Sequence, residues 1–275
     1  MVRVRVSEMC PTRTRRRRSS RVGAGRCSTN RFTSRSRPAA VSCRLWRTFY
    51  IDHVSMDRTI RMTENNFLEG IPEAVPDKMP VRGDGNTLQI NEIFYSIEGE
   101  GARVGQPTTF VRLAKCNLAC FFCDTEFDSY SDMSVTEIVE AAKAHPAEWV
   151  SLTGGEPLGQ DLRPLCRALG DAGYRLHIET NGVTKPDAEL FELIEYWTVS
   201  PKRRRVIEGF VRIDELKYIV GKSFREDQVQ PDIAKVIYLQ PESSKPEFIQ
   251  KTLGILTRHP DWRLSCRIHK MLKLP

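Results

Sequence analysis

Apolar and polar positions follow two alternating patterns from about residue 88 to the end of the chain. Residues 88–97 and 107–114 are short β-branched and aromatic runs between Gly and Pro turns, which predicts strands. Residues 134–145 begin with a Ser that can start a helix and then carry apolar side chains at helical spacing. The same reading predicts further strands at 149–155, 174–182, 197–201, 215–220, 235–241 and 262–268, and helices at 162–173, 187–196 and 245–260.

Strands that alternate with helices predict a parallel sheet built from right-handed β-α-β units. About six such units fall short of the eight in a complete barrel, so we expect an α/β fold, an incomplete parallel β/α barrel of about six strands. Polar or glycine-rich signatures (TGGEP, ETNG, VSPK, LQPES) follow directly after strands. Ligands bind at the carboxyl ends of parallel strands, so these signatures predict one shared site.

The first 85 residues differ in composition from the rest, and we expect a disordered leader over 1–85 and one folded domain over 86–275. Residues 1–55 contain fourteen Arg, no Lys and two acids, whereas the remaining residues carry 28 basic and 33 acidic side chains. The basicity therefore belongs to the leader, and the domain is mildly acidic. The leader is interpreted as a nucleic-acid-binding arm, as an organelle transit peptide, or as sequence upstream of a later start at Met56 or Met62; we favour the last.

The chain has eight Cys, and no run of residues is apolar enough for a secretory signal or a membrane-spanning helix. Cysteines in this context indicate reduced thiols used for metal or redox chemistry. Cys116, Cys120 and Cys123 follow a predicted strand at spacings of four and three residues. Structural zinc needs four ligands, which Cys166, Cys266 or a His would have to complete. An iron–sulfur cube with three thiolates instead leaves one iron open.

The segment CNLACFFC (116–123) resembles the signature of the radical S-adenosylmethionine (SAM) superfamily. The resemblance implies a [4Fe-4S] cluster on the three cysteines, S-adenosyl-L-methionine on the open iron, and a radical SAM type of partial barrel. TGGEP (153–157) resembles the GGE motif of the same superfamily, in which Glu156 would accept from the ammonium group of the cofactor. Phe122 occupies the position of an aromatic residue near the adenine.

The resemblance narrows to the 7-carboxy-7-deazaguanine synthase family and covers the chain from about residue 91 to 275. It is carried by NEIFYSIEGEG, FVRLAKCNLACFFCDTEF, TGGEP, IETNG, VSPK, DELKYIV, YLQPES and RLSCRIHKMLKLP. It implies a carbon–nitrogen lyase of the queuosine (7-deazapurine) pathway. The implied reaction converts 6-carboxy-5,6,7,8-tetrahydropterin into 7-carboxy-7-deazaguanine, with ring contraction and loss of ammonia.

The same resemblance implies roles for individual residues. Thr125 would bind Mg²⁺ through its hydroxyl, a hard oxygen ligand. The implied SAM contacts are Phe122, Asp124, Gly155, Glu156, Ser200, Pro201, Lys202, Gln240, Pro241, Glu242 and Ser243. The implied substrate contacts are Ile97, Glu98, Gly99, Glu100, Arg112, Thr153, His269 and the terminal carboxylate of Pro275. Many relatives carry Gln where this chain has Glu98. Glu179 and Asn181 lie at the same predicted edge, whereas His145, His177 and His259 are interpreted as structural.

Two other functions remain as alternatives. A glycyl-radical activating enzyme would share the cysteine motif and GGE but act on a protein glycine; Cys-Asp-Thr at 123–125, Arg112 and the end of the chain argue against it. A metal-stabilised module that binds RNA through the basic leader is disfavoured by the acidic domain. The resemblance thus implies a homodimer that takes a pterin and a reductant such as flavodoxin or ferredoxin. We expect it in the cytoplasm, with no membrane or direct nucleic-acid partner.

Overall fold

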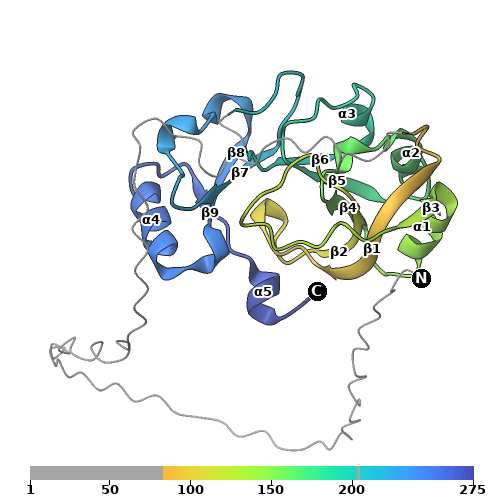
Figure 1. Ribbon diagram of the computed structural model, residues 1–275, viewed down its shortest axis with the longest axis horizontal. Helices are drawn as coiled ribbons and strands as arrows, with labels where there is room; N and C mark the ends of the chain where they lie inside the picture. The colour runs from red at the N-terminus through yellow and green to blue at the C-terminus, as the bar shows by residue number, and fades with distance from the viewer. Residues whose placement is uncertain (1–82, 203–204) are drawn as a thin grey trace, which may run out of the picture. The chain divides into compact units, whose positions relative to one another are not determined.

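A computed structural model describes residues 83–202 and 205–275 of the chain. The expected leader over 1–85, with its candidate starts at Met56 and Met62, lies almost entirely outside the described residues. The described part is built on one nine-stranded sheet of order β3-β1-β2-β4-β5-β6-β7-β8-β9 (Figure 1). The sheet is open, because β3 and β9 form its two edges.

The parallel part of the sheet contains seven strands and begins at β2. Its strands are β2 (Pro107–Leu113), β4 (Trp149–Gly154), β5 (Arg175–Thr180), β6 (Tyr196–Val199), β7 (Glu215–Val220), β8 (Val236–Pro241) and β9 (Arg263–Leu264). Two antiparallel strands extend it at one edge, β1 (Thr87–Ile97) next to β2 and β3 (Ser131–Ser134) next to β1. The incomplete parallel barrel expected from the sequence is therefore present, with seven parallel strands rather than about six. The strand expected over 88–97 is the antiparallel β1, whereas β3 was not expected.

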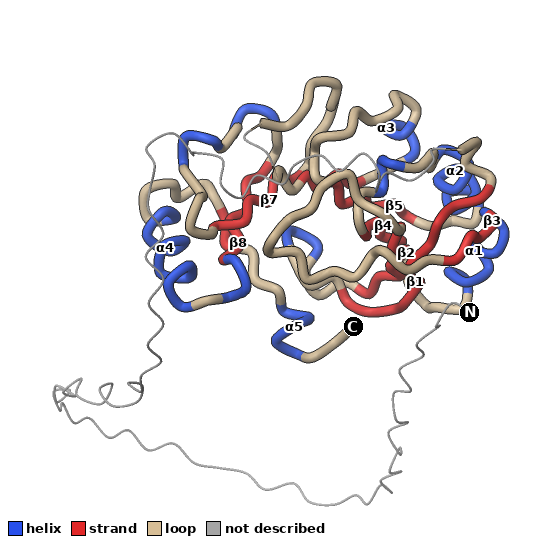
Figure 2. The backbone as a smooth tube through the Cα atoms, in the orientation of Figure 1, coloured by secondary structure: helices blue, strands red, loops and turns tan. Residues whose placement is uncertain are grey.

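Helices lie at the periphery of the band of strands (Figure 2). They are α1 (Val135–Lys143), α2 (Arg163–Asp171), α3 (Leu190–Leu193), α4 (Pro246–Leu256) and α5 (Ile268–Leu272). The N-terminus of α1 shows why the sequence pattern worked. The hydroxyl of Ser134 accepts from the Glu137 N–H at 3.3 Å, and the Glu137 carboxylate accepts from the Ser134 N–H at 2.8 Å. This capping box satisfies two backbone donors that a helix start leaves unpaired.

Two predicted elements are shorter in the structure. The helix expected over 187–196 is the single turn α3, and the last strand is only the two residues of β9. Apolar side chains around α3 are buried by packing without a long regular element, as Phe191 stacking on Trp197 illustrates, whereas Leu264 of β9 is exposed. Periodicity identifies burial better than it identifies the length of an element.

The core fills the space between the sheet and the outer helices. Fully buried residues on alternate positions of β4, β5 and β6, such as Val150, Leu152 and Ile178, pack against Leu165 and Leu169 of α2. A second cluster joins β7 and β8 to α4 through Leu216, Leu239 and Ile255. This packing fixes the strand ends, and therefore the side chains that follow them. Within the described ranges, no helix has the length and apolarity needed to cross a membrane.

We expect Leu165→Ala to lower the free energy of unfolding by about 2–5 kcal/mol, because it leaves a cavity at a fully buried site. Urea unfolding followed by circular dichroism measures the change. Leu253→Ala on α4 is the matched control, since Leu253 is 41% exposed. Equal losses in the two variants would contradict the assignment of α2 to the core.

Candidate active site

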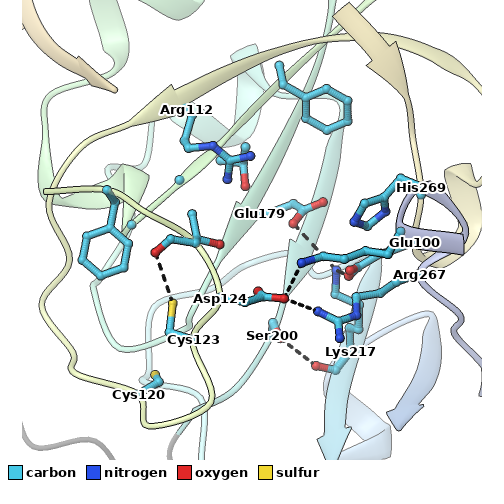
Figure 3. A pocket seen from close by; sticks show the side chains of 18 of the residues that line it. Glu100, Arg112, Cys120, Cys123, Asp124, Glu179, Ser200, Lys217, Arg267 and His269 are labelled. Carbon is cyan, nitrogen blue, oxygen red and sulfur yellow. Dashed lines mark hydrogen bonds and ion pairs between the residues drawn. The ribbon is translucent and has the colours of Figure 1, made fainter. Parts of the chain in front are cut away.

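A cavity of about 600 Å³ opens at the carboxyl ends of the parallel strands (Figure 3). Residues at or just after the ends of β2, β4, β5, β6 and β8 line it, together with the middle of β7. The loop after β1 and the helix α5 complete its wall. The polar signatures that the sequence placed after separate strands therefore do meet at one site.

The cysteine segment forms a loop that leaves β2 and lines one side of this cavity. Cys116 is buried, Cys120 is half-buried and Cys123 is exposed, and all three line the cavity. The N–H of Cys123 donates to the carbonyl of Cys120 at 3.1 Å, which closes a turn between the second and third cysteines. Burial raises the pKa of the Cys116 thiol to about 12 and also raises that of Cys120, where nearby Lys202 acts in the opposite direction.

A bulge in β1 holds the far end of the cysteine loop. The register of β1 on β2 shifts between Ile90 and Glu92, which leaves Asn91 as the extra residue. Its side-chain amide donates to the Glu126 carboxylate at 2.8 Å and to the Ser129 carbonyl at 2.7 Å. The hydroxyl and N–H of Ser129, together with Asn91, hold the pKa of Glu126 at about 2. Glu126 thus ties the loop to the sheet.

Three thiols on one side of an open cavity suit a cluster with a vacant iron better than a closed zinc site. Cys166, one candidate for a fourth ligand, lies on α2 inside the core with no exposed surface, and burial raises its pKa. Cys266, the other cysteine candidate, is exposed and is not part of the cavity wall. Of the described histidines, only His269 lines the wall, and its ring packs on Gly99. Of the cysteines in the described ranges, only the three of the loop therefore meet at the site.

The glycine pair after β4 packs directly on the base of the cysteine loop. The Gly155 N–H donates to the Leu113 carbonyl at 3.0 Å, and the Glu156 N–H donates to the Lys115 carbonyl at 2.9 Å. A Cβ atom at position 155 would lie 1.8 Å from the carbonyl oxygen of Lys115. Only glycine fits there, because any side chain would push the loop away from the strand.

Glu156 lies behind this turn rather than on the cavity wall. Its carboxylate is fully buried and accepts from the Thr180 hydroxyl at 2.7 Å, the Asn181 N–H at 2.8 Å and the Leu158 N–H at 3.0 Å. Burial raises its pKa, and these hydrogen bonds oppose the rise. The carboxylate thus joins the ends of β4 and β5.

The loop after β1 is organised by the side chain of Glu98. This carboxylate is 2% exposed, and one of its oxygens accepts from the N–H of Gly99 at 2.9 Å and of Glu100 at 3.3 Å. Its other oxygen lies 3.8 Å from the guanidinium of Arg103 and 3.5 Å from the Nδ1 atom of His177. Burial raises the pKa of Glu98, but His177, Lys217 and Arg103 outweigh burial and leave it lowered. The side chain therefore fixes the loop backbone.

Glu100 points from this loop toward the middle of β7. Its carboxylate lies 2.5 Å from the ammonium of Lys217, which also lies 3.7 Å from the carboxylate of Glu179 (Figure 3). Lys217 was not among the residues expected at the site, although a lysine inside the apolar strand ELKYIV is a signal in the sequence that can identify it. A buried charge on such a strand requires an ionised partner.

Arg112 lies on β2 and faces the cavity across from the cysteine loop. Its Nε atom donates to the Glu92 carboxylate at 2.8 Å, and its guanidinium lies 5.4 Å from the ring centre of Phe94. These contacts orient the planar guanidinium group at the cavity wall. Thr125 lines the same cavity from the cysteine loop, and Thr153 lines it from the end of β4.

The helix α5 closes the cavity by contacts with two of its loops. Asp124 lies 2.6 Å from the guanidinium of Arg267 and 2.5 Å from the ammonium of Lys270, and these cations lower its pKa against the effect of burial. The N–H of Ile268 donates to the carbonyl of Gly99 at 3.0 Å. Neither α5 nor the pairing of Asp124 was expected, because a five-residue helix has no periodicity to detect.

His269 and Pro275 reach the cavity from this helix and from the residues after it. The ring of His269 packs on Gly99 so closely that a Cβ atom there would lie 1.8 Å from Nδ1. Burial lowers the pKa of His269. The main-chain oxygen of Pro275 accepts from the buried Ser96 hydroxyl at 3.2 Å.

Most residues that the sequence proposed for the site do line the cavity. Glu156 and Pro201 are the two that do not. Glu179 and Asn181 line it as well, whereas His177 lies buried beneath the loop after β1, and His145 and His259 stack on Tyr95 and Trp262 away from it. Charged residues of the wall that were not predicted from the sequence are Glu92, Glu126, Lys217, Arg267 and Lys270.

Comparison with known proteins identifies the family. The sequence model of the radical SAM superfamily matches residues 111–200, which include the cysteine loop and the glycine turn. The 7-carboxy-7-deazaguanine synthase of Bacteroides thetaiotaomicron is 40% identical over 187 residues, which are 68% of this chain and 98% of that protein. The enzyme of the same name from Burkholderia multivorans is 33% identical over 69% of this chain and 100% of its own length.

The fold agrees with this relationship. The crystal structure of QueE from Escherichia coli superposes with a TM-score of 0.55 at 27% sequence identity and covers 65% of this chain and 93% of that one. The radical SAM type of α/β fold predicted from the sequence is confirmed. Similarity over nearly the whole length of these relatives shows that the chain belongs to the 7-carboxy-7-deazaguanine synthase family of the radical SAM superfamily.

Proposed function

We propose that this cavity converts 6-carboxy-5,6,7,8-tetrahydropterin into 7-carboxy-7-deazaguanine, with ring contraction and release of ammonia, for queuosine (7-deazapurine) synthesis. One observation carries the proposal: the three-thiol loop shares a single cavity with Thr125, Arg112 and Glu100. A cavity of about 600 Å³ is large enough for a cofactor and a bicyclic substrate together. The glycyl-radical alternative is not retained, because the relatives that match over nearly their whole length are synthases.

Membership of the superfamily implies a [4Fe-4S] cluster and S-adenosylmethionine. When bound, they supply the radical that removes hydrogen from the substrate, while the protein positions the reactants and excludes water. We assign Cys116, Cys120 and Cys123 to the cluster, since they are the thiols at the cavity. The proposed SAM contacts on the wall are Phe122, Asp124, Gly155, Ser200, Lys202, Gln240, Pro241, Glu242 and Ser243. Glu156 and Pro201 would act indirectly, by shaping the backbone behind the wall.

On the substrate side, we assign Arg112 as the partner of the substrate carboxylate, because its planar guanidinium can donate to both carboxylate oxygens. Glu100 and Glu179 present acceptors for the amino and ring N–H groups of the pyrimidine edge. Ile97, Gly99, Thr153, His269 and Pro275 are the remaining proposed contacts. The Glu98 side chain acts on the loop backbone, so its contribution to binding is indirect.

Three further expectations from the family resemblance remain proposals. Mg²⁺ would bind the hydroxyl of Thr125 together with substrate oxygens and water, the ligands that this cation prefers. The electron would come from a reductant such as flavodoxin or ferredoxin. The protein would act as a homodimer in the cytoplasm.

The first test is turnover by protein reconstituted anaerobically with iron and sulfide. We expect 7-carboxy-7-deazaguanine to form from 6-carboxytetrahydropterin when SAM, Mg²⁺ and a reductant are present. Liquid chromatography measures the product. Cys123→Ala removes one cluster ligand and is expected to abolish both the iron–sulfur absorbance and turnover. Cys266→Ala is the matched control and should retain both. A Cys123→Ala protein with full turnover would overturn the assignment.

Thr125→Ala is expected to raise the Mg²⁺ concentration for half-maximal turnover at least ~10-fold, because a direct oxygen ligand is lost. Thr125→Ser keeps the hydroxyl and should stay near the value of the parent enzyme. Mg²⁺ titrations at saturating SAM measure the effect. An unchanged Mg²⁺ response in the Ala variant would dismiss this ligand.

Residues 86–275 are proposed to be the complete radical SAM domain, with 1–85 dispensable for catalysis. Every proposed site residue lies between Ile97 and Pro275, and the superfamily match lies within this range. A chain that starts at residue 86 is therefore expected to show the kcat and KM of the full chain. A binding assay with transfer RNA on both chains tests the alternative of a nucleic-acid-binding leader. Loss of turnover in the shorter chain would contradict the proposed boundary.

A further inference from the structure

Lys217 is a buried cation at the floor of the cavity. It lies in the middle of β7, and its side chain is only 5% exposed although it lines the cavity. Residues on β7 alternate in the usual way of a strand, with Leu216 and Tyr218 facing the apolar cluster under α4 and Lys217 and Ile219 facing the site. The lysine thus occupies an inward position that an apolar residue would fill at lower cost.

The ammonium of Lys217 bridges two acids that come from different parts of the sheet. Its Nζ atom lies 2.5 Å from Glu100, in the loop after β1, and 3.7 Å from Glu179, at the end of β5. Both carboxylates also line the cavity, and they retain 17% and 23% exposure. Because the two acids share one cation, their positions relative to each other depend on it.

Other charged groups surround this trio, and each affects its charge balance. Glu215 lies on the same strand, Lys202 follows β6, and His269 faces Glu100 from α5. Beneath them, Glu98 is paired with Arg103 and lies beside His177. Burial would lower the pKa of Lys217, but Glu100, Glu179 and Glu215 together outweigh burial and raise it. The lysine therefore keeps its positive charge at neutral pH.

A metal ion is a poorer explanation for this cluster of acids. Oxygen and nitrogen atoms of Glu98, His177 and Glu179 lie within 4.8 Å of one another, which is close enough to share a cation. However, Arg103 already contacts the Nδ1 atom of His177 at 2.8 Å, and Lys217 already pairs with Glu179. Two side-chain cations thus provide the positive charge that such a site would take from an ion.

We propose that Lys217 is a positioning residue that holds Glu100 and Glu179 on one shared cation, as acceptors for the guanidine-like edge of the bicyclic substrate. The inference rests on the function proposed above, which brings that edge to the two acids. Two carboxylates near one another tend to share a proton unless a cation separates them. A shared proton would turn one acceptor into a donor, and the site would then repel the N–H groups that it must bind.

The test is the pH dependence of binding to reconstituted enzyme, measured with pterin-6-carboxylate, a stable fluorescent analogue of the substrate. The parent enzyme defines the reference profile, which includes the titration of His269. In Lys217→Met, no cation separates the two carboxylates, so a proton can take its place between them at low pH. We expect the affinity of this variant at about pH 5.5 to be at least ~10-fold weaker than at about pH 7.5, relative to the parent.

Three variants separate this role from a general effect on folding. Lys217→Arg keeps the charge and should restore the parent profile, while Lys143→Met removes an exposed lysine of α1 and should leave it unchanged. Iron content and thermal unfolding show whether each protein is folded. If Lys217→Met does not fold, the double variant Glu100→Gln/Lys217→Met removes an acid and its cation together. Its affinity should fall more steeply toward low pH than that of Glu100→Gln alone, because Glu179 loses its cation.

The possible outcomes are distinguishable. If the affinity of Lys217→Met, or of the double variant, depends on pH as that of the parent does, the role of Lys217 is overturned and the proposed function stays intact. Absence of probe binding and of pterin turnover in the parent enzyme would overturn the proposed function, and the inference with it. If Lys217→Met loses probe affinity at low pH and Lys217→Arg does not, both the role of Lys217 and the proposed function are supported.

Discussion

The site depends on the close approach of two backbones, the glycine turn after β4 and the base of the cysteine loop after β2. Hydrogen bonds of 3.0 and 2.9 Å join them, and the missing side chain at Gly155 makes the distance possible. This contact fixes where the loop leaves the sheet and therefore where the three thiols lie. The buried Glu156 carboxylate extends the same constraint to the end of β5, because it accepts from Thr180 and Asn181.

Charge balance is the second constraint, and it acts beneath the cavity. Four buried or half-buried acids, Glu98, Glu100, Glu179 and Glu215, face two buried cations, Arg103 and Lys217. Burying charges is costly unless each is paired, so the network holds its members in one arrangement. Glu98 and Glu215 accept from backbone N–H groups of the loop after β1, at Gly99 and Ala102 respectively. The charges thus shape the loop that reaches the substrate.

The last residues of the described chain connect these two regions. The helix α5 contacts the cysteine loop through Asp124 and the loop after β1 through Gly99. The cluster loop and the substrate loop, which come from different edges of the cavity, are therefore held by one short segment. Surface ion pairs are individually weak, so the backbone hydrogen bond at Gly99 and the packing of His269 on it provide most of the geometric definition.

The sequence by itself determined the alternation of strands and helices, the cysteine loop, the glycine turn and the family, because each depends on residues that are close together in the chain. Ser134 starts α1 as the local pattern predicts. Tertiary structure alone decided the role of Lys217 and the pairing of Asp124 with α5. It also decided that the carboxylates of Glu98 and Glu156 bind backbone N–H groups of the protein. These depend on partners that are distant in the chain, and a residue type does not reveal which distant charge it will meet. Likewise, α3 and β9 are short because packing, not periodicity, sets where an element ends.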